Sequence, residues 1–307
     1  MARTLKAPMT SASLITIVIP TTCSADRHES LLRAVQSAHA ASCQPIAVLV
    51  VVNGSRVDAD TLAELTEQPV TIDRQREGSL PKALARGRSL VQTPFFGFLD
   101  DDDELLPGAL DSRLALMLAD PRLGLVVSNG YRELQGKRSS AVPSLEGVDR
   151  EPLRQLLSNN WLASCAGLYR TSMVSGAYFQ QIHAFAEWTW LGYRLCLAGT
   201  LVGVVREHGF VVHDTPGSLS KSAGYQRSYV ALLDRMLAEN PPRWARKALL
   251  AKRSAALHDL SAKALQDGEL VVSWQLHLRS LGGLHGWRYL PYTRHLVWQA
   301  LGLAKSS

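Results

Sequence analysis

The sequence has no long apolar run and few cysteines, and each absence excludes a class of protein. The longest apolar run, Ile46–Val52, is the length of a strand, far below the about 18 residues that a membrane-spanning helix needs. The N-terminus lacks the apolar core of a signal peptide. The four cysteines are scattered without CxxC spacing or histidine partners. We therefore expect no membrane crossing, no disulfide framework, no zinc site and a reducing, cytoplasmic location.

Glycine-rich phosphate loops are also missing. No GxGxxG follows an expected strand, which disfavours a dehydrogenase. The segment after the first expected strand, IPTTCSADRHES, lacks the glycine-rich loop expected of a nucleotidyltransferase. No recognised nucleic-acid motif occurs, so we expect no nucleic-acid partner.

Positive charge is concentrated in the last part of the chain. The net charge is +6, but residues 221–307 hold 13 lysines and arginines against 5 acidic residues, and residues 1–220 hold 20 against 22. Four of the seven tryptophans lie in the same basic segment. The change predicts a boundary near residue 220. We expect a loose leader over 1–12, one domain over 13–220 and a basic helical region over 221–307.

Strands and helices alternate through the first 220 residues. Continuous apolar, β-branched runs predict buried strands, and apolar residues at helical spacing between them predict helices. This order predicts an α/β fold with a mostly parallel sheet flanked by helices, and ligands at the carboxyl ends of the strands. Residues 130–147 are polar and predict a surface loop or hairpin. The expected strands are 14–19, 46–52, 70–73, 95–99, 124–128, 163–169, 200–205 and 210–212; helices are expected after Asp26, at 58–66, 79–91, from Pro107, at 150–158, 187–198, 225–237, 244–265, 270–281 and 292–303.

Five consecutive carboxylates, Asp100–Glu104, follow the expected strand FFGFL. They would repel one another without a cation, and alternate residues of an extended segment project to one side. Asp100 and Asp102 can therefore converge on a divalent metal ion. The alternative is a solvated acidic loop before the helix at Pro107, whose N-terminal dipole favours negative charge. The position at a strand end favours the metal site.

Six segments resemble a known family in their order and spacing. They are IVIPTT, VVVNGS, GSLPKALARG, FLDDDDELLPGAL, EWTWLGYRL and HDTPGSLS. Together they resemble the inverting glycosyltransferases of family two, which have the GT-A fold, over residues 15–220. The resemblance implies a nucleotide-sugar half at 13–130, an acceptor half at 131–220, and Mg²⁺ or Mn²⁺ as cofactor.

The resemblance implies a place for the nucleotide. Its base would lie near Pro20, Thr21 and Asn53, and because an Asn amide can pair with uracil, a UDP-sugar is the expected donor. Asn53 can instead belong to a plain turn, since Asn-Gly is a common turn sequence. Arg76 and Lys82 are candidates to hold the nucleotide, and the alternative for both is a solvated helix face.

Within the acidic run, the resemblance distinguishes the carboxylates by role. Asp100 would approach the ribose or a metal-bound water, and Asp102 would ligate the metal that bridges the two phosphates. Asp101 and Asp103 would assist or contact the donor. The metal would neutralise the charge that builds on the departing diphosphate.

Inverting transfer needs a general base that takes the proton of the acceptor hydroxyl. The resemblance assigns this role to Glu187. The family has two acids before the tryptophan of this motif, whereas Ala186 precedes Glu187 here. Glu187 is the only carboxylate between Glu151 and Glu207, and burial in this apolar stretch would raise its pKa. The alternative is an ordinary glutamate at a helix N-terminus.

The last candidate residues follow from the same motifs. His213 would reach the metal or the diphosphate, although a lone histidine is more often an ordinary surface or core residue. Ser218 and Ser220 would belong to a lid over the donor. Trp188 and Trp190 would frame the acceptor pocket or fill its core.

We therefore expect a metal-dependent inverting glycosyltransferase that acts on a glycan or lipid-linked acceptor in surface polysaccharide assembly of the bacterial type. The missing acid at Ala186 leaves a second hypothesis, an inactive nucleotide-sugar-binding or scaffolding protein at a membrane. The basic region 221–307 has three interpretations: a helical cap on the catalytic domain, a segment that docks on an anionic membrane at the inner face of the cell, or a homo-oligomer interface.

Overall fold

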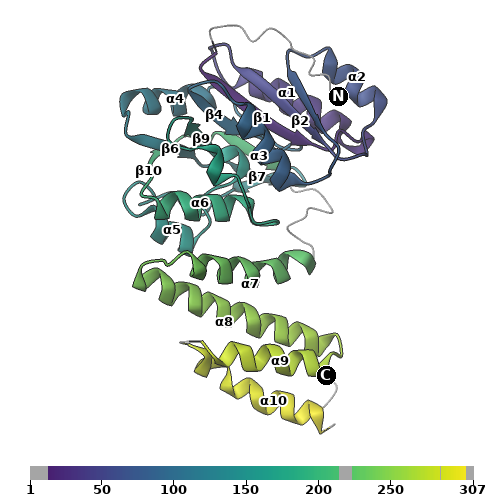
Figure 1. Cartoon of the computed structure of the whole chain (residues 1–307), viewed down its shortest axis with the longest axis vertical. Coiled ribbons are helices and arrows are strands. Elements are labelled where there is room, and N and C mark those ends of the chain that lie inside the picture. The colour runs from purple at the N-terminus through teal and green to yellow at the C-terminus, as the bar shows by residue number, and fades with distance from the viewer. Residues whose placement is uncertain (1–12, 214–222, 284, 302–307) are drawn as a thin grey trace. The chain divides into compact units, whose positions relative to one another are not determined.

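The computed structural model describes residues 13–213, 223–283 and 285–301. The chain divides into two compact units, Met1–Pro216 and Gly217–Ser307. Figure 1 shows strands and helices in the first unit and helices in the second. In the described residues, no helix is long and apolar enough to span a membrane.

The first unit is built on a sheet of seven described strands in the order β10-β6-β9-β4-β1-β2-β3. Neighbouring strands are parallel except where β9 pairs with β4 and β6. The mostly parallel sheet predicted from the sequence is therefore confirmed. Its strands are β1 Ile15–Thr21, β2 Ala47–Asn53, β3 Thr71–Gln75, β4 Phe95–Phe98, β6 Leu123–Ser128, β9 Gly167–Arg170 and β10 Leu201–Val205.

The central strands are apolar on both faces because helices cover them. All residues of β1 are buried. Helices α1 (His28–Ala40) and α3 (Leu80–Leu90) pack against β1 and β2, and α4 (Ala109–Ala119) packs against β6 and β10. Helix α3 comes closest at Gly87, where a Cβ atom would lie 2.4 Å from a methyl group of Val18. This close approach lets α3 pack directly on the middle of β1.

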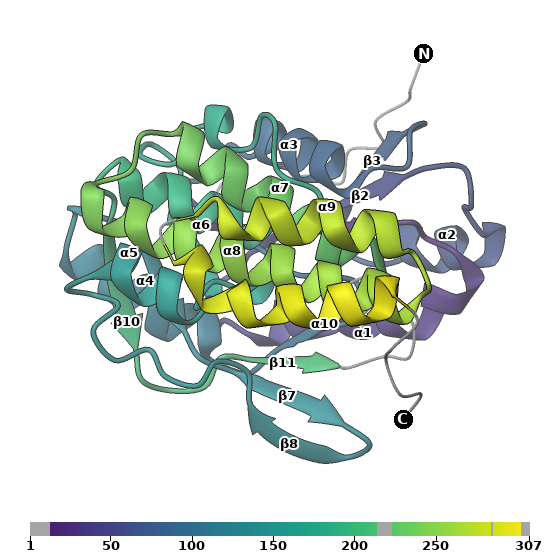
Figure 2. The same cartoon turned by 90° about the horizontal axis from the view of Figure 1, so that it is seen from below.

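A second sheet, of four described strands in the order β5-β11-β7-β8, begins where the acidic run ends. Strand β5 (Glu104–Leu105) pairs antiparallel with β11 (Phe210–His213), and β11 runs parallel to β7 (Tyr131–Leu134). Strands β7 and β8 (Lys137–Ser140) form a hairpin within residues 130–147, and Figure 2 shows it beside β11. This pairing brings His213 next to the acidic run, although 109 residues separate it from Glu104.

Three predicted boundaries in the first unit are wrong. Helix α1 begins at His28 because Ala25–Arg27 form a 3₁₀ turn, so Asp26 is not its N-cap. Helix α4 begins at Ala109 rather than Pro107, after Gly108 with a left-handed φ of 73°. The strand expected from 163 begins at Gly167, after a 3₁₀ turn. The remaining helices of this unit are α2 Ala59–Thr66, α5 Pro152–Ser158 and α6 Glu187–Leu197.

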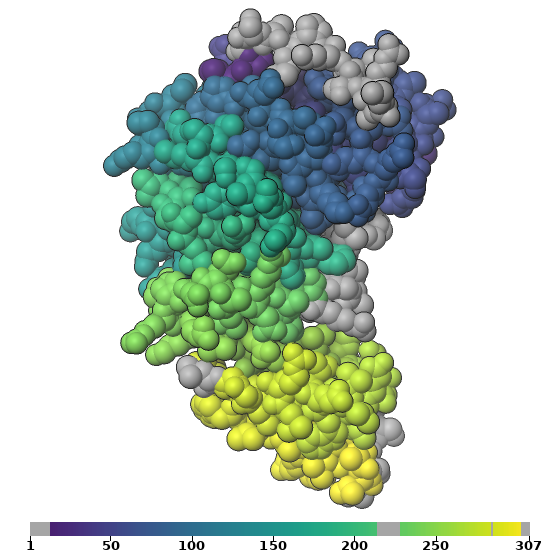
Figure 3. All heavy atoms as spheres, viewed as in Figure 1, coloured from purple at the N-terminus to yellow at the C-terminus, as the bar shows by residue number. Residues whose placement is uncertain are grey.

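The described residues of the second unit form the four helices that the sequence predicts. Each packs on the next in chain order, from α7 to α10, and Figure 1 shows them stacked one below another. Figure 3 shows their side chains as spheres, with α9 and α10 in yellow. The helices are α7 Ala223–Ala238, α8 Arg243–Gln266, α9 Leu270–Leu281 and α10 Leu290–Ala300, with a 3₁₀ turn at Gly286–Tyr289 before the last.

Candidate active site

The candidate site lies at the carboxyl ends of β1, β2 and β4. Parallel strands end at one edge of a sheet, and ligands of open α/β sheets bind there. Thr21 ends β1, Asn53 ends β2, and the acidic run follows β4 directly. The Thr21 hydroxyl donates a hydrogen bond of 2.6 Å to Asp101 Oδ2. The fold therefore joins two predicted site residues that are 80 positions apart in the sequence.

The carboxylates of the acidic run do not share one environment. Asp103 is buried and accepts hydrogen bonds from the His213 backbone N–H at 3.1 Å and from the Cys165 thiol at 3.8 Å. The side chains of Asp101 and Asp102 are 13% and 22% exposed. Asp103 therefore belongs to the protein interior, whereas Asp102 is the most accessible of the three.

Burial and mutual repulsion raise the pKa values of this run. Burial raises the pKa of Asp100, the charges of Asp102 and Glu187 raise it further, and a hydrogen bond from Ser164 opposes the change. Burial and the charges of Asp100 and Asp102 also raise the pKa of Asp103 well above its usual value. Such a cluster is stabilised by added positive charge.

Arg27 supplies positive charge to the middle of the run. Nη1 of Arg27 lies 2.5 Å from Asp102 Oδ2 and 3.3 Å from Asp101 Oδ1. Burial raises the pKa of Asp101 to about 6, while the Thr21 hydrogen bond and Arg27 hold it down. The sequence prediction missed Arg27. The available signal was a cation in the turn that follows β1, at the same edge of the sheet as the acidic run.

Glu187 is the first residue of α6 and faces the same edge. Its side chain is buried, and Oε1 accepts a hydrogen bond of 3.0 Å from the Phe185 backbone N–H. Burial raises the pKa of Glu187, and this hydrogen bond opposes the rise. The charge of Glu187 also acts on Asp100. The two predicted functional carboxylates therefore lie within electrostatic reach of each other.

The two tryptophans of α6 have different surroundings. Trp188 is half-buried and its ring lies 5.3 Å from that of Phe98, the last residue of β4. Trp190 is buried and stacks on Tyr193 at 6.1 Å between ring centroids. Trp188 is therefore partly accessible next to the last residue of β4, and Trp190 fills the core.

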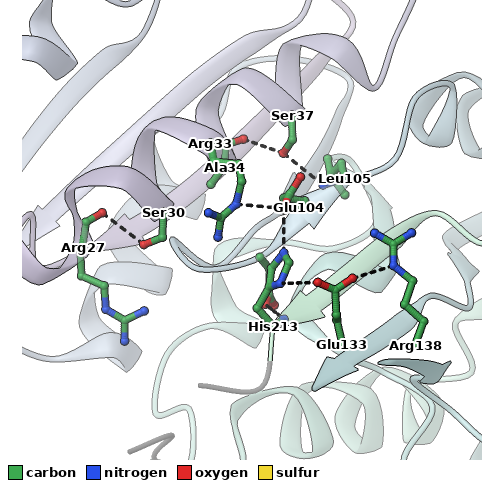
Figure 4. A network of polar contacts seen from close by, with 11 residues as sticks. Arg27, Ser30, Arg33, Ala34, Ser37, Glu104, Leu105, Glu133, Arg138 and His213 are labelled. Carbon is green, nitrogen blue, oxygen red and sulfur yellow. Dashed lines mark hydrogen bonds and ion pairs between the residues drawn. The ribbon is translucent and has the colours of Figure 1, made fainter. Parts of the chain in front are cut away.

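His213 turns its ring toward two carboxylates of the small sheet, as Figure 4 shows. Its Nε2 lies 2.7 Å from Glu104 Oε1, and its Nδ1 lies 3.8 Å from Glu133 Oε1. Arg33 of α1 also pairs with Glu104, at 2.9 Å. His213 therefore contacts the acidic run at its end, through the ring to Glu104 and through the backbone N–H to Asp103.

Asn53 joins two of the elements that end at this edge. Its Nδ2 donates to the Thr21 carbonyl at 2.9 Å, and its Oδ1 accepts from the Ser79 backbone N–H at 3.1 Å. Pro20 is buried inside β1. These residues shape the floor of the predicted nucleotide site.

The predicted cations and lid have other surroundings. Lys82 is exposed and pairs with Glu77 at 2.5 Å, and Arg76 is also exposed. Neither contacts the acidic run in any described interaction. Ser218 and Ser220 lie outside the described residues.

The comparisons with known proteins agree with this geometry. The family model for glycosyl transferase family 2 matches residues 16–178, more than half of the chain. The chain belongs to glycosyltransferase family 2. The resemblance stated from the motifs is thereby confirmed.

Solved structures similar to this glycosyltransferase come from Staphylococcus aureus. It is similar to TarS 1-349 in complex with UDP-GlcNAc, with a TM-score of 0.64 and 14% identity over 95% of this chain and 93% of that chain. TarS 1-349 alone gives a TM-score of 0.58 at 13% identity over the same shares, 95% and 93%. TarS 1-349 in complex with UDP gives 0.53 at 12% identity over 78% and 70%. These likenesses show the GT-A fold. A search of curated proteins found no relative that matches the chain.

The acidic run of this glycosyltransferase fits a hard divalent cation, because carboxylate oxygens are the donors that such cations prefer. In the described part of the chain, no group of three or more His, Cys, Asp or Glu side chains converges to form a complete metal cage. Mg²⁺ does not require one, because it binds through one or two carboxylates together with substrate phosphates and water. Asp102, accessible and next to Arg27, is the residue that would hold the ion.

Proposed function

We propose that the chain is an inverting, metal-dependent glycosyltransferase that moves a sugar from a nucleotide diphosphate to a glycan or lipid-linked acceptor. The observation that carries this proposal is the placement of two kinds of carboxylate at one edge of the sheet. The acidic run offers an accessible Asp102, and Glu187 offers a buried carboxylate whose charge reaches Asp100. The accessible Asp102 suits a cation bound together with phosphates, and the buried Glu187 suits proton transfer.

Asp102 and Arg27 form the donor end of the proposed site. Asp102 would hold Mg²⁺ or Mn²⁺, which would supply a Lewis acid for the charge on the departing diphosphate. Arg27, within 3.3 Å of both Asp101 and Asp102, adds a guanidinium that can bind phosphate oxygens in a bidentate manner. His213 could become a second metal ligand only by leaving Glu104.

Glu187 is the proposed general base. It takes the proton of the acceptor hydroxyl while the hydroxyl oxygen bonds to the anomeric carbon and the bond from that carbon to the diphosphate oxygen breaks. Attack from the face opposite the diphosphate inverts the anomeric centre. The bond from the Phe185 N–H fixes one carboxylate oxygen and leaves the other for the acceptor.

We propose a UDP-sugar as donor and a role in surface polysaccharide assembly at the inner, cytoplasmic face of a cell membrane. A protein of the same fold, TarS, was solved in complex with UDP-GlcNAc and with UDP. The Asn53 amide is bonded to the Thr21 carbonyl and the Ser79 N–H, so Asn53 would hold the end of β1 and the start of α3 beside the base rather than pair with the base.

The test is donor binding with and without metal. UDP-, GDP- and dTDP-sugars are titrated calorimetrically, and Mn²⁺ is expected to strengthen binding of one nucleotide about ten-fold or more. Asp102→Asn should remove that gain, whereas Asp60→Asn, at an exposed position on α2, should keep it. Binding that responds neither to Mn²⁺ nor to Asp102→Asn would contradict the assignment.

The second hypothesis, a binding or scaffolding protein without activity, rests on Ala186. This residue is the N-cap of α6, and its side chain makes no capping hydrogen bond. Turnover of a bound donor, measured as slow hydrolysis without acceptor, separates the hypotheses. A protein that binds donor, does not hydrolyse it and gains turnover with Ala186→Asp would favour the inactive form.

A further inference from the structure

Small polar side chains take part in the contact between α8 and α9. Ser261 Oγ donates to the Ser273 carbonyl at 2.8 Å, and Ser273 Oγ donates to the Ser261 carbonyl at 2.8 Å. Both serines are fully buried. Near the other end of α9, Gly283 lies against Ser254, where a Cβ atom would come 2.1 Å from the serine oxygen. The two helices therefore approach closely at these two points.

A polar pair also joins α9 and α10. His277 of α9 is fully buried, and its Nε2 lies 2.7 Å from the Thr293 hydroxyl of α10. Burial lowers the pKa of His277, which keeps the ring neutral. The ring of Tyr292 lies 5.4 Å from His277. In the described residues of α10, Leu296 is the only one that is buried.

Large apolar side chains lie on the outside of α10 instead. Exposed residues recur there at positions i, i+4, i+7, i+8 and i+11, which is one face of a helix. Trp298 is 45% exposed and Leu301 is 64% exposed. We call this set the α10 face; it consists of Leu290, Arg294, Val297, Trp298 and Leu301.

Exposed apolar residues also occur in the segments that pack on α10. Trp287, in the 3₁₀ turn before α10, is 66% exposed, and Leu278 of α9 is also exposed. Figure 2 shows α9 and α10 side by side, and the two helices are in contact. The described part of this unit buries Leu249, Leu257 and Leu296, yet it leaves this group of large apolar side chains exposed, which is typical of a docking surface.

The charge on this surface has one sign. No Asp or Glu occurs after Glu269, whereas Arg279, Arg288 and Arg294 all follow it. In the described part of the chain, none of these three arginines forms an ion pair. The Arg288 guanidinium lies 5.9 Å from the centre of the Trp287 ring, and that of Arg294 lies 4.8 Å from the centre of the Trp298 ring.

We propose that the α10 face, together with Trp287 and Leu278, docks on an anionic lipid surface. Tryptophan and leucine insert into the boundary between head groups and acyl chains, while arginines beside them contact lipid phosphates. The 11 residues of α10 span about 16 Å, half of a hydrocarbon core, so the helix lies in the plane of the interface.

Charge complementarity favours lipid over a second copy of this chain. A two-fold interface would place the same face against itself. Arg288 and Arg294 would then meet arginines, because this face carries no carboxylate. An anionic membrane supplies the negative charge that the face lacks.

Flotation of the full chain with vesicles tests the proposal. Vesicles of phosphatidylcholine with phosphatidylglycerol are expected to bind the protein at least ten-fold more tightly than vesicles of phosphatidylcholine alone, and high salt should reduce the difference. The assay needs no sugar transfer. Its failure would therefore leave the proposed transferase activity untouched.

Matched variants identify the surface. Trp298→Ala should weaken binding to both kinds of vesicle about ten-fold. Arg294→Gln should weaken binding to the anionic vesicles about five-fold, which corresponds to about 1 kcal/mol, and leave the neutral ones unchanged. Trp244→Ala is the control. Trp244 is an exposed tryptophan on α8 rather than on α10, and it lies ten residues before Ser254. It is therefore about 15 Å along α8 from the contact between Ser254 and Gly283.

Two outcomes would overturn the proposal. One is that the protein binds its donor normally but binds anionic vesicles no more tightly than neutral ones. The other is concentration-dependent dimerisation in light scattering that Trp298→Ala abolishes, because the α10 face would then be covered by a second copy. Equal losses for Trp298→Ala and Trp244→Ala would count against the assignment to the α10 face.

Discussion

Nη1 of Arg27 lies 2.5 Å from Oδ2 of Asp102, the carboxylate that we propose as metal ligand. Arg27 comes from the turn before α1, and Asp102 follows β4, so the pair joins the first and fourth strands of the chain across the site. The guanidinium neutralises part of the acidic run. A divalent cation at Asp102 must therefore compete with Arg27 until phosphate oxygens give the arginine another partner.

Arg27→Gln is expected to strengthen Mn²⁺ binding in the absence of nucleotide by about five-fold, because the variant removes a competing cation from a partly buried pair. Calorimetric titration of Mn²⁺ measures the change. Arg33→Gln is the matched control, since Arg33 pairs with Glu104 instead. Equal Mn²⁺ affinity in the wild type and Arg27→Gln would show that the pair does not restrict the metal site.

Glu187→Gln is expected to lower turnover by about 10²–10⁴-fold, the usual effect of removing a general base. Donor affinity should stay within about two-fold, because the amide oxygen can still accept from the Phe185 N–H. Steady-state kinetics and donor titration measure the two quantities. Turnover near the wild-type value would rule out Glu187 as the base, and Glu146→Gln, at an exposed position, is the control.

The pH dependence of kcat/KM should reflect the buried base. Burial raises the pKa of Glu187, and only the unprotonated carboxylate can take a proton. Activity is therefore expected to fall as pH drops through a pKa above the usual value of about 4.3 for glutamate. Donor binding over the same pH range separates this effect from protonation of Asp101, whose pKa is about 6. An acid limb at or below the ordinary glutamate pKa would contradict the prediction.

Asp103→Asn is expected to raise the free energy of unfolding at pH 8. The pKa of Asp103 is raised by burial, so the folded state holds its proton to higher pH than the unfolded state. Stability is then lost as pH rises from the unfolded pKa through the folded one, by about 1.4 kcal/mol for each unit of increase. The asparagine oxygen keeps the bond from the His213 N–H.

Urea unfolding of the wild type and Asp103→Asn at pH 5 and pH 8 measures whether the free energy of unfolding rises as predicted. Asp111→Asn is a control of opposite sign, because hydrogen bonds from Ser42 and Cys43 lower the pKa of Asp111. That variant should destabilise the protein at pH 8. If Asp103→Asn is less stable than the wild type at pH 8, the contacts of the ionised carboxylate stabilise the fold by more than its burial destabilises it, and the prediction is wrong.

His213→Gln tests whether the ring has a role in metal binding. The ring bonds to Glu104 at 2.7 Å, and the backbone bond to Asp103 does not depend on the side chain. We expect Mn²⁺-supported donor binding to stay within about two-fold and stability to fall by about 1 kcal/mol. A loss of ten-fold or more in Mn²⁺ affinity would instead favour the ring as a ligand.

The order of strands and helices was predictable because the central strands of the large sheet, such as β1, β4 and β6, are buried along their whole length and form apolar runs in the sequence. The place of the acidic run was predictable for the same reason, since it begins where the apolar residues of β4 end. Starts of helices were less predictable. At Asp26 and Pro107 a favourable cap residue is present, yet a 3₁₀ turn and the left-handed Gly108 delay the helix.

Partners within the site were not predictable, because long-range packing sets them. Arg27 and Asp102 are 75 residues apart, and His213 and Glu104 are 109 apart. No local pattern couples such positions. Trp188 and Trp190 likewise look alike in the sequence, and only the packing of α6 decides that Trp188 is half-buried and Trp190 is buried in the core.

Local residue patterns were enough to establish the α/β class, the acidic strand end, the family and the basic character of the last helices. These features depend on runs of apolar or charged residues that are close together in the sequence. The tertiary structure decided which charges meet. It paired Arg27 with Asp102 and the His213 ring with Glu104, and it left large apolar side chains of α10 exposed. These outcomes depend on contacts between distant segments, which form only when the strands pair and the helices pack.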